Sequence, residues 1–187
     1  MQDLAADLEE LRSKACELGA SAAKIVDVAG IKTGAWTRMK CQYGCPNYGL
    51  SLCCPPYTPD YAQMREFLAE YAAAVLVEYT FPLKEEDCTD FAAADLRMSN
   101  ELLNILLALE KKAFFQNHYR AFALKAGRCR LCEQCNLKKC VHPAKARPSL
   151  EACGIDVFAL ANDNGFNMQV ITGPITELKV YGLLLVE

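Results

Sequence analysis

Three cysteines stand at equal spacing in the second half of the chain. Cys129, Cys132 and Cys135 form a C-x2-C-x2-C run, and Cys140 follows after four more residues. Bacterial ferredoxins use such a trio to bring thiolates to the irons of a [4Fe–4S] cluster, and their fourth cysteine ligates the other cluster. Cys140 is therefore expected either to close the same cluster or to reach a second one.

Zinc is the competing metal for this segment. Structural zinc sites usually divide their ligands into two C-x2-C pairs that lie a dozen or more residues apart. Three cysteines within seven residues fit that pattern poorly, although Cys140 and His142 offer further ligands. The spacing and the softness of thiolate ligands favour an iron–sulfur cluster, with zinc as the less favoured alternative.

A second group of four cysteines lies earlier in the chain. Cys41 and Cys45 precede the adjacent pair Cys53 and Cys54, which leads into two prolines. The prolines stiffen the loop, because each fixes φ and removes a hydrogen-bond donor. Adjacent side chains point in different directions, so Cys53 and Cys54 are not expected to bind metal equivalently.

The first group is expected to bind metal through Cys41, Cys45 and Cys54. Either Cys53 or the distant Cys153 is the candidate for a fourth ligand, and Cys153 is equally compatible with a place in the core. A site that lacks a fourth thiolate would leave one iron open to substrate. Four aromatic residues are expected to shield this site: Trp36, Tyr43, Tyr48 and Tyr57. Two lone thiols, Cys16 and Cys88, are predicted to be structural or merely exposed.

The segments around the cysteines predict the elements that position them. Apolar residues at helical spacing indicate a helix from Leu4 to Leu18, which Gly19 ends. Further helices are expected at 60–71, at 90–125 with a break near Ser99-Asn100, and at 149–162. Strands are expected at 23–28, 74–81, 166–171 and 178–186.

This order predicts an α/β or α+β fold. We expect a single domain over residues 1–187, with about four strands and flanking helices. Two irregular stretches, 30–60 and 127–148, would be its metal-binding loops. A long irregular stretch inside a domain needs a function or a ligand to hold it.

The composition excludes several classes of protein. The 187 residues include eleven cysteines and carry a formal net charge of −3, which does not suggest a surface for nucleic acid. The apolar runs are shorter than the ~20 residues of a membrane helix, and the N-terminus lacks the features of a signal peptide. We therefore expect a cytoplasmic protein, in which clustered thiols are metal ligands or catalysts more often than disulfides.

The cysteine groups also carry a family resemblance. Cys-x-Tyr-Gly-Cys stands at 41–45, Cys-Pro-Pro-Tyr at 54–57, the cysteine trio at 129–135 and Arg-Pro-Ser at 147–149. Together these motifs resemble the predicted metal-binding protein family, domain of unknown function 2284, over nearly the whole chain. The resemblance implies metal binding, of an iron–sulfur kind, in microbes with an anaerobic style of metabolism. It implies no particular reaction.

The leading hypothesis is an iron–sulfur protein with one or two [4Fe–4S] clusters, which acts as an electron carrier or an oxidoreductase. One alternative is a reductase with a substrate-accessible iron in the first loop. The other is a zinc-stabilised binding module without catalysis. A run of basic residues is expected either to be solvated or to dock an acidic redox partner: Lys125, Arg128, Arg130, Lys138, Lys139, Lys145 and Arg147. No nucleic-acid or membrane partner is expected, and a homodimer is compatible with the sequence.

Overall fold

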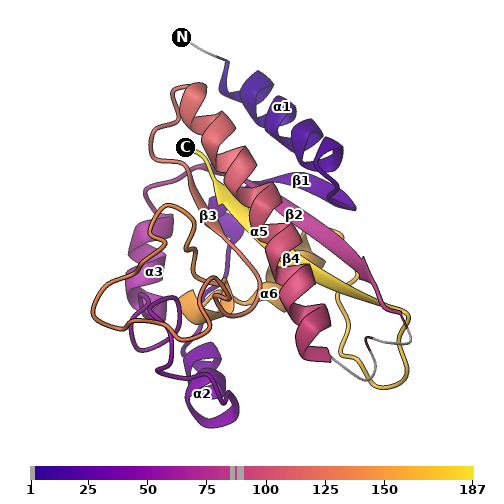
Figure 1. The fold of residues 1–187 in the computed structure, drawn as a ribbon. Coiled ribbons are helices and arrows are strands. Elements are labelled where there is room, and N and C mark those ends of the chain that lie inside the picture. The colour runs from indigo at the N-terminus through magenta and orange to yellow at the C-terminus, as the bar shows by residue number, and fades with distance from the viewer. Residues whose placement is uncertain (1–2, 85–86, 88–90) are drawn as a thin grey trace.

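A four-stranded antiparallel sheet lies at the centre of the computed structural model, which describes residues 3–84, 87 and 91–187 (Figure 1). The strands lie in the order β1-β2-β4-β3. Their bounds are β1 Ala22–Asp27, β2 Ala73–Pro82, β3 Phe122–Leu124 and β4 Glu177–Leu185. The antiparallel sheet with helices packed around it is an α+β fold, which confirms the second of the two expected classes.

Helices α1 Leu4–Glu17 and α5 Phe91–Phe115 cover one face of this sheet, and α3 Tyr61–Leu68 and α6 Val157–Asp163 cover the other. The remaining helices are α2 Ala35–Gly44 and the short 3-10 helices η1 Val28–Gly30 and η2 Glu151–Cys153. Local signals set several of their ends. Asp60 and Gln63 form a capping box at the start of α3, which satisfies otherwise unpaired backbone donors. No helix among the described residues is long and apolar enough to cross a membrane.

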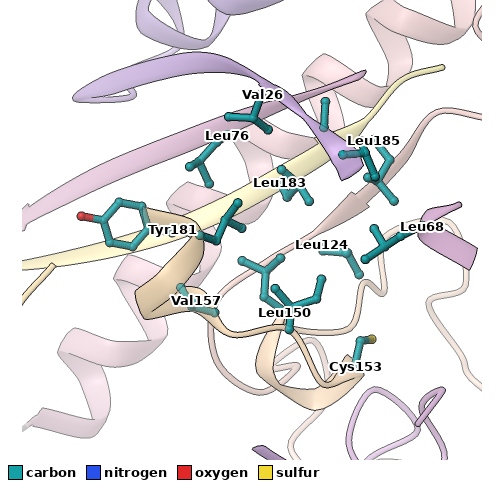
Figure 2. Packing of buried hydrophobic residues seen from close by; sticks show 14 of the residues in the cluster. Val26, Leu68, Leu76, Leu124, Leu150, Cys153, Val157, Tyr181, Leu183 and Leu185 are labelled. Carbon is teal, nitrogen blue, oxygen red and sulfur yellow. The ribbon is translucent and has the colours of Figure 1, made fainter. Parts of the chain in front are cut away.

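Neighbouring residues on the central strands enter two different cores. Val75 and Leu184 belong to a cluster with Leu11 of α1 and Leu106 of α5 on one face of the sheet. Leu183, one residue away from Leu184, faces the opposite core, which is built from α3, α6, η2 and loop residues (Figure 2). Successive strand side chains alternate between faces, so a strand covered on both sides is apolar throughout.

The structure corrects three expected elements. The helix expected at 90–125 ends at Phe115, runs without a break through Ser99, and is followed by strand β3. Asn117 adopts a positive φ of 69°, a conformation that ends helices. The strand expected at 166–171 is absent, because Asn162 bonds the backbone N–H and C=O of Met168 at 2.9 and 3.2 Å.

The third correction concerns the first cysteine loop, which contains helix α2 rather than irregular chain throughout. The loop is tied to the segment that follows the second loop. Arg38 of α2 donates to both oxygens of Thr58 and to the carbonyl of Ala152, at 3.0 to 3.3 Å. The Thr58 hydroxyl donates to the same Ala152 carbonyl at 2.6 Å. The two bonds to Ala152 join residues that lie more than 90 positions apart in the chain.

Gly154 allows this close approach. Its φ is +88°, and a Cβ built there would lie 2.9 Å from the Cα of Tyr61. Gly154→Ala is therefore expected to destabilise the protein by about 2–4 kcal/mol, because backbone strain and a backbone clash add. Gly19→Ala is the matched control, since Gly19 has a φ of +105° but open space around it. Equal losses in the free energy of unfolding for both variants would contradict this account.

The second cysteine loop is fastened to helix α5 at three positions. Arg130 forms an ion pair with Asp95, Lys125 donates to Ser99, and Arg147 forms an ion pair with Glu110. The base of the loop is closed by two backbone hydrogen bonds of 3.0 Å, from Lys125 N–H to Pro148 C=O and from Leu150 N–H to Lys125 C=O. A single long helix therefore holds both ends of the loop.

Arg147→Met tests the strongest of these ion pairs. The side chains of Arg147 and Glu110 are 11% and 17% exposed, and Arg147 Nε donates to Glu110 at 2.8 Å. Loss of the cation leaves a poorly solvated carboxylate, so we expect a loss of about 2–4 kcal/mol in urea denaturation. Arg12→Met, which breaks a solvent-exposed pair with Glu9 on α1, should cost much less, because water screens exposed ion pairs. Similar losses for the two variants would show that the α5 pair does not anchor the loop.

Candidate metal centre

Two neighbouring cavities lie where the two cysteine loops meet. The first encloses about 180 Å³ and is lined by Cys41, Cys45 and Cys54. The second encloses about 210 Å³ and is lined by Cys129, Cys132 and Cys135. Asn47 and Arg128 line both cavities, so the cavities share a wall.

Helix α2 and a set of tight turns place the thiols of the first loop. Cys41 lies in the last turn of α2, and the N–H of Cys45 donates to its carbonyl at 3.3 Å. Residues four apart on a helix lie on one face, so both thiols meet the same cavity. The N–H of Cys54 donates to the carbonyl of Ser51 at 3.0 Å, and the N–H of Cys53 donates to the Ser51 hydroxyl at 3.2 Å. These turns fix the adjacent pair.

The adjacent cysteines face different partners. Cys53 is hydrogen-bonded to the sulfur of Cys129, and the charges of Cys129 and Cys140 raise its pKa. The pKa of Cys54 is raised by burial and then by the charges of Cys45 and Cys41. The hydrogen bond from Cys53 lowers the pKa of Cys129 to about 6 and, together with burial, raises the pKa of Cys53. The pair therefore shifts in opposite directions, with Cys129 the more acidic of the two thiols.

Cys140 lies with the second group. The charge of Cys140 raises the pKa of both Cys132 and Cys53. For Cys132, burial is the largest cause of the raised pKa, followed by the charges of the three other cysteines of the loop. The structure therefore brings together the four cysteines of the second loop, with Cys53 of the first loop beside them.

Cys153 occupies the apolar core on the second face of the sheet. It is 1% exposed and belongs to the cluster that contains Leu150 and Ile155. Figure 2 shows Cys153 at the edge of this cluster, near Leu150. Burial raises its pKa to about 12, and the charged groups that act on it are Arg38 and Glu151. Its neighbour Ala152, rather than Cys153, lines the first cavity. Cys16 is exposed, the described cysteines form no disulfides, and Cys88 lies outside the described residues.

The aromatic residues near the first loop divide into two groups. Tyr48 lines the first cavity, and Trp36 lines a separate apolar pocket that Cys41 and Cys45 also line. Tyr43 and Tyr57 are 75% and 47% exposed. Two of the four expected residues therefore lie beside the thiols.

Two charged residues contribute to this region: Glu151, to which the sequence analysis gave no role, and Lys125, which it placed in the basic run. Glu151 lines the first cavity, and its Oε2 atom is buried without a hydrogen-bond partner among the described residues. Lys125 is 1% exposed, and its Nζ donates to the Ser99 hydroxyl and to the carbonyls of residues 126, 127 and 128 at 2.7 to 3.1 Å. Burial lowers the pKa of Lys125 to about 8, against the effect of Cys129 and Glu151.

The basic run expected as one surface is divided by the fold. Lys125 is buried, and Arg130 and Arg147 form the ion pairs with α5. The exposed lysines of the second loop are Lys138, Lys139 and Lys145. The second loop therefore presents a smaller cationic surface than the sequence suggests.

The thiols of this region line the two cavities and do not converge on one point. Among the described residues, no three His, Cys, Asp or Glu side chains form a group that could hold one metal ion. The shared wall instead carries a buried Nε of Arg128 without a hydrogen-bond partner among these residues. Thiols around a cavity and an unsatisfied cationic donor between two cavities fit anionic iron–sulfur clusters, whose sulfurs accept hydrogen bonds.

Comparison with known proteins identifies the family to which this chain belongs. A comparison with curated proteins found no match, and a comparison with solved structures also found none. A family model described as Predicted metal-binding protein (DUF2284) matches residues 24–186, a stretch that includes both cysteine loops and nearly the whole sheet. The match confirms the resemblance drawn from the cysteine motifs. The chain belongs to this family of predicted metal-binding proteins.

Proposed function

We propose that this chain binds two [4Fe–4S] clusters, one in each cavity, and acts in electron transfer. The observation that carries the proposal is the pair of thiol-lined cavities with a shared wall at Asn47 and Arg128. The first cluster would be held by Cys41, Cys45 and Cys54. The second would be held by four ligands: Cys129, Cys132, Cys135 and Cys140. Bound clusters supply one-electron redox chemistry, which protein side chains do not provide.

The shape of the cavities supports clusters over zinc. A zinc ion draws four ligands to one point, with Zn–S distances of about 2.3 Å. Here the thiols lie on the walls of cavities of about 180 and 210 Å³. A cubane cluster, whose thiolates each bind a different iron, uses ligands arranged around a volume.

The surrounding residues tune such a site. Arg128 lines both cavities, and its buried Nε–H has no hydrogen-bond partner among the described residues. The buried ammonium of Lys125 donates to the carbonyl of Arg128, the residue directly before Cys129. Cations near a cluster favour its reduced and more negative state. We extend the proposal to an acidic redox partner that meets Lys138, Lys139 and Lys145 on the exposed side of the loop, and to a reducing, cytoplasmic setting of anaerobic metabolism.

Reductive titration tests the electron-transfer proposal. The anaerobically purified protein should take up about two electrons per chain and lose visible absorbance, because each cluster accepts one electron. An apo sample prepared with a chelator is the control and should take up none. A metal-loaded protein that accepts no electrons would contradict the proposal and favour the zinc-stabilised module.

A reductase is the second candidate function, and an apolar pocket favours it. This pocket encloses about 240 Å³ beside Cys41 and Cys45, with walls that include Trp36 and Phe158. Its size suits a molecule smaller than a typical drug. Small ligands should then change the EPR spectrum of the first cluster and leave the second unchanged. A spectrum that no small ligand alters would argue against this candidate.

A further inference from the structure

We propose that the carboxylate of Glu151 is the fourth ligand of the first cavity and completes its set of three thiols. This inference rests on the proposed function, because it names a residue that would bind the first cluster. Sequence reasoning considered only cysteines for this position. The structure directs both cysteine candidates elsewhere: Cys53 is hydrogen-bonded to Cys129, and Cys153 lies in the apolar core.

The first observation is an unsatisfied atom. Oε2 of Glu151 is buried and has no hydrogen-bond partner among the described residues. Buried polar atoms almost always have a partner, so each exception calls for an explanation, and one such explanation is a bound ion. Glu151 lines the same cavity of about 180 Å³ as Cys41, Cys45 and Cys54. A metal centre bound there would satisfy the free oxygen.

The second observation is the rigidity of the segment that carries Glu151. It begins η2, and the N–H of the next residue, Ala152, donates to the Ser149 hydroxyl at 3.1 Å. The carbonyl of Ala152 accepts from Arg38 and from the Thr58 hydroxyl, which ties the segment to the first loop. A ligand must be held in place by its neighbours, and these bonds fix the backbone of Glu151 relative to the first cysteine loop.

The third observation is chemical. The other polar residues on the cavity wall include Asn47, Tyr48 and Ser149, and the Ser149 hydroxyl already accepts a hydrogen bond. Glu151 is the carboxyl oxygen donor on this wall, and iron accepts carboxylate as well as thiolate ligands. The arrangement therefore supplies three soft donors and one hard donor to one cavity.

A carboxylate ligand would also connect the two candidate functions. Glu151 lines the apolar pocket of about 240 Å³ as well as the first cavity. The same carboxylate would therefore lie between a metal centre in the first cavity and a small, mainly apolar molecule in the pocket.

The test compares four proteins after anaerobic reconstitution with iron and sulfide: the wild type, Glu151→Gln, Glu151→Cys and Glu66→Gln. Glu66 is the matched control, because it is an exposed carboxylate on α3 that lines neither cavity. Iron content and EPR spectra are measured, and the signal of the second cluster reports that each variant is folded.

Glu151→Gln is expected to lose about one iron per chain and to show the EPR signal of a three-iron cluster, because one iron lacks its anionic ligand. Glu151→Cys should keep the wild-type iron content with a changed spectrum, since a thiolate replaces an oxygen donor. Glu66→Gln should match the wild type. These three results together support the inference.

Two outcomes would overturn it. One is a Glu151→Gln protein with the iron content and first-cluster spectrum of the wild type. The other, which decides the matter if Glu151→Gln does not fold, is a Glu151→Cys protein whose spectrum equals that of the wild type. Failure of the proposed function is a separate result, because the wild type itself would then bind no iron and sulfide.

Discussion

Cys54→Ala is expected to abolish the first cluster and leave the second in place, whereas Cys53→Ala should leave both clusters bound. The two residues are adjacent, yet Cys54 lines the first cavity and Cys53 is hydrogen-bonded to Cys129 beside the second. Iron content should fall by about half in the Cys54 variant, because one of two clusters is lost. Anaerobic iron analysis and EPR spectroscopy measure both effects.

The Cys53 variant has an expected effect of its own. A hydrogen bond to a ligand sulfur stabilises the more negative, reduced cluster, so its removal lowers the reduction potential. The potential of the second cluster should therefore fall in Cys53→Ala, while that of the first stays close to the wild-type value. Equal iron loss in both variants would contradict the division of the adjacent pair between two cavities. Loss of the second cluster in Cys53→Ala alone would make Cys53 a ligand in place of Cys140.

Lys125→Met is expected to be the most destabilising of the lysine substitutions in the second loop. The ammonium donates to the Ser99 hydroxyl and to three consecutive carbonyls, so its loss leaves buried acceptors without donors. Unsatisfied buried acceptors cost about 1–3 kcal/mol each, and relief from burying a charge offsets part of this. We expect a net loss of about 2–4 kcal/mol in urea denaturation.

The same substitution should impair metal binding. The three carbonyls belong to residues 126–128, directly before Cys129, so the start of the second loop loses its attachment to α5. Iron content at the second site should fall while the first-site EPR signal remains. Lys139→Met is the control, because Lys139 is exposed in the same loop and should change neither quantity. An unchanged denaturation midpoint in Lys125→Met would show that the buried ammonium does not organise the loop.

The sequence allowed much of the architecture to be predicted. The apolar periodicity located α1, α3, β1, β2 and β4 within a few residues, because each element has a regular buried side. It failed at β3, where Phe122–Leu124 continues an apolar helical pattern and only the pairing with Leu183 to Leu185 makes it a strand. It also failed at 166–171, where the side chain of Asn162 bonds the backbone in place of a neighbouring strand.

The sequence predicted the cysteines of the candidate site but not the buried positions of Lys125 and Glu151 beside them. The spacing of the cysteines showed two groups, and the structure places seven of their eight thiols accordingly, with Cys53 beside the second group. Glu151 gave no such signal, because a lone glutamate is usually exposed, and Lys125 was expected only as one residue of the basic run. Their burial follows from tertiary contacts with α5 and with the first loop, which no local pattern records.

Anaerobic analysis of iron and acid-labile sulfide is the most direct test of the account. The purified, reconstituted protein is expected to contain about eight irons and eight sulfides per chain, since each [4Fe–4S] cluster contributes four of each. A colourless protein with stoichiometric zinc and no sulfide would contradict the proposal that these two cavities hold iron–sulfur clusters.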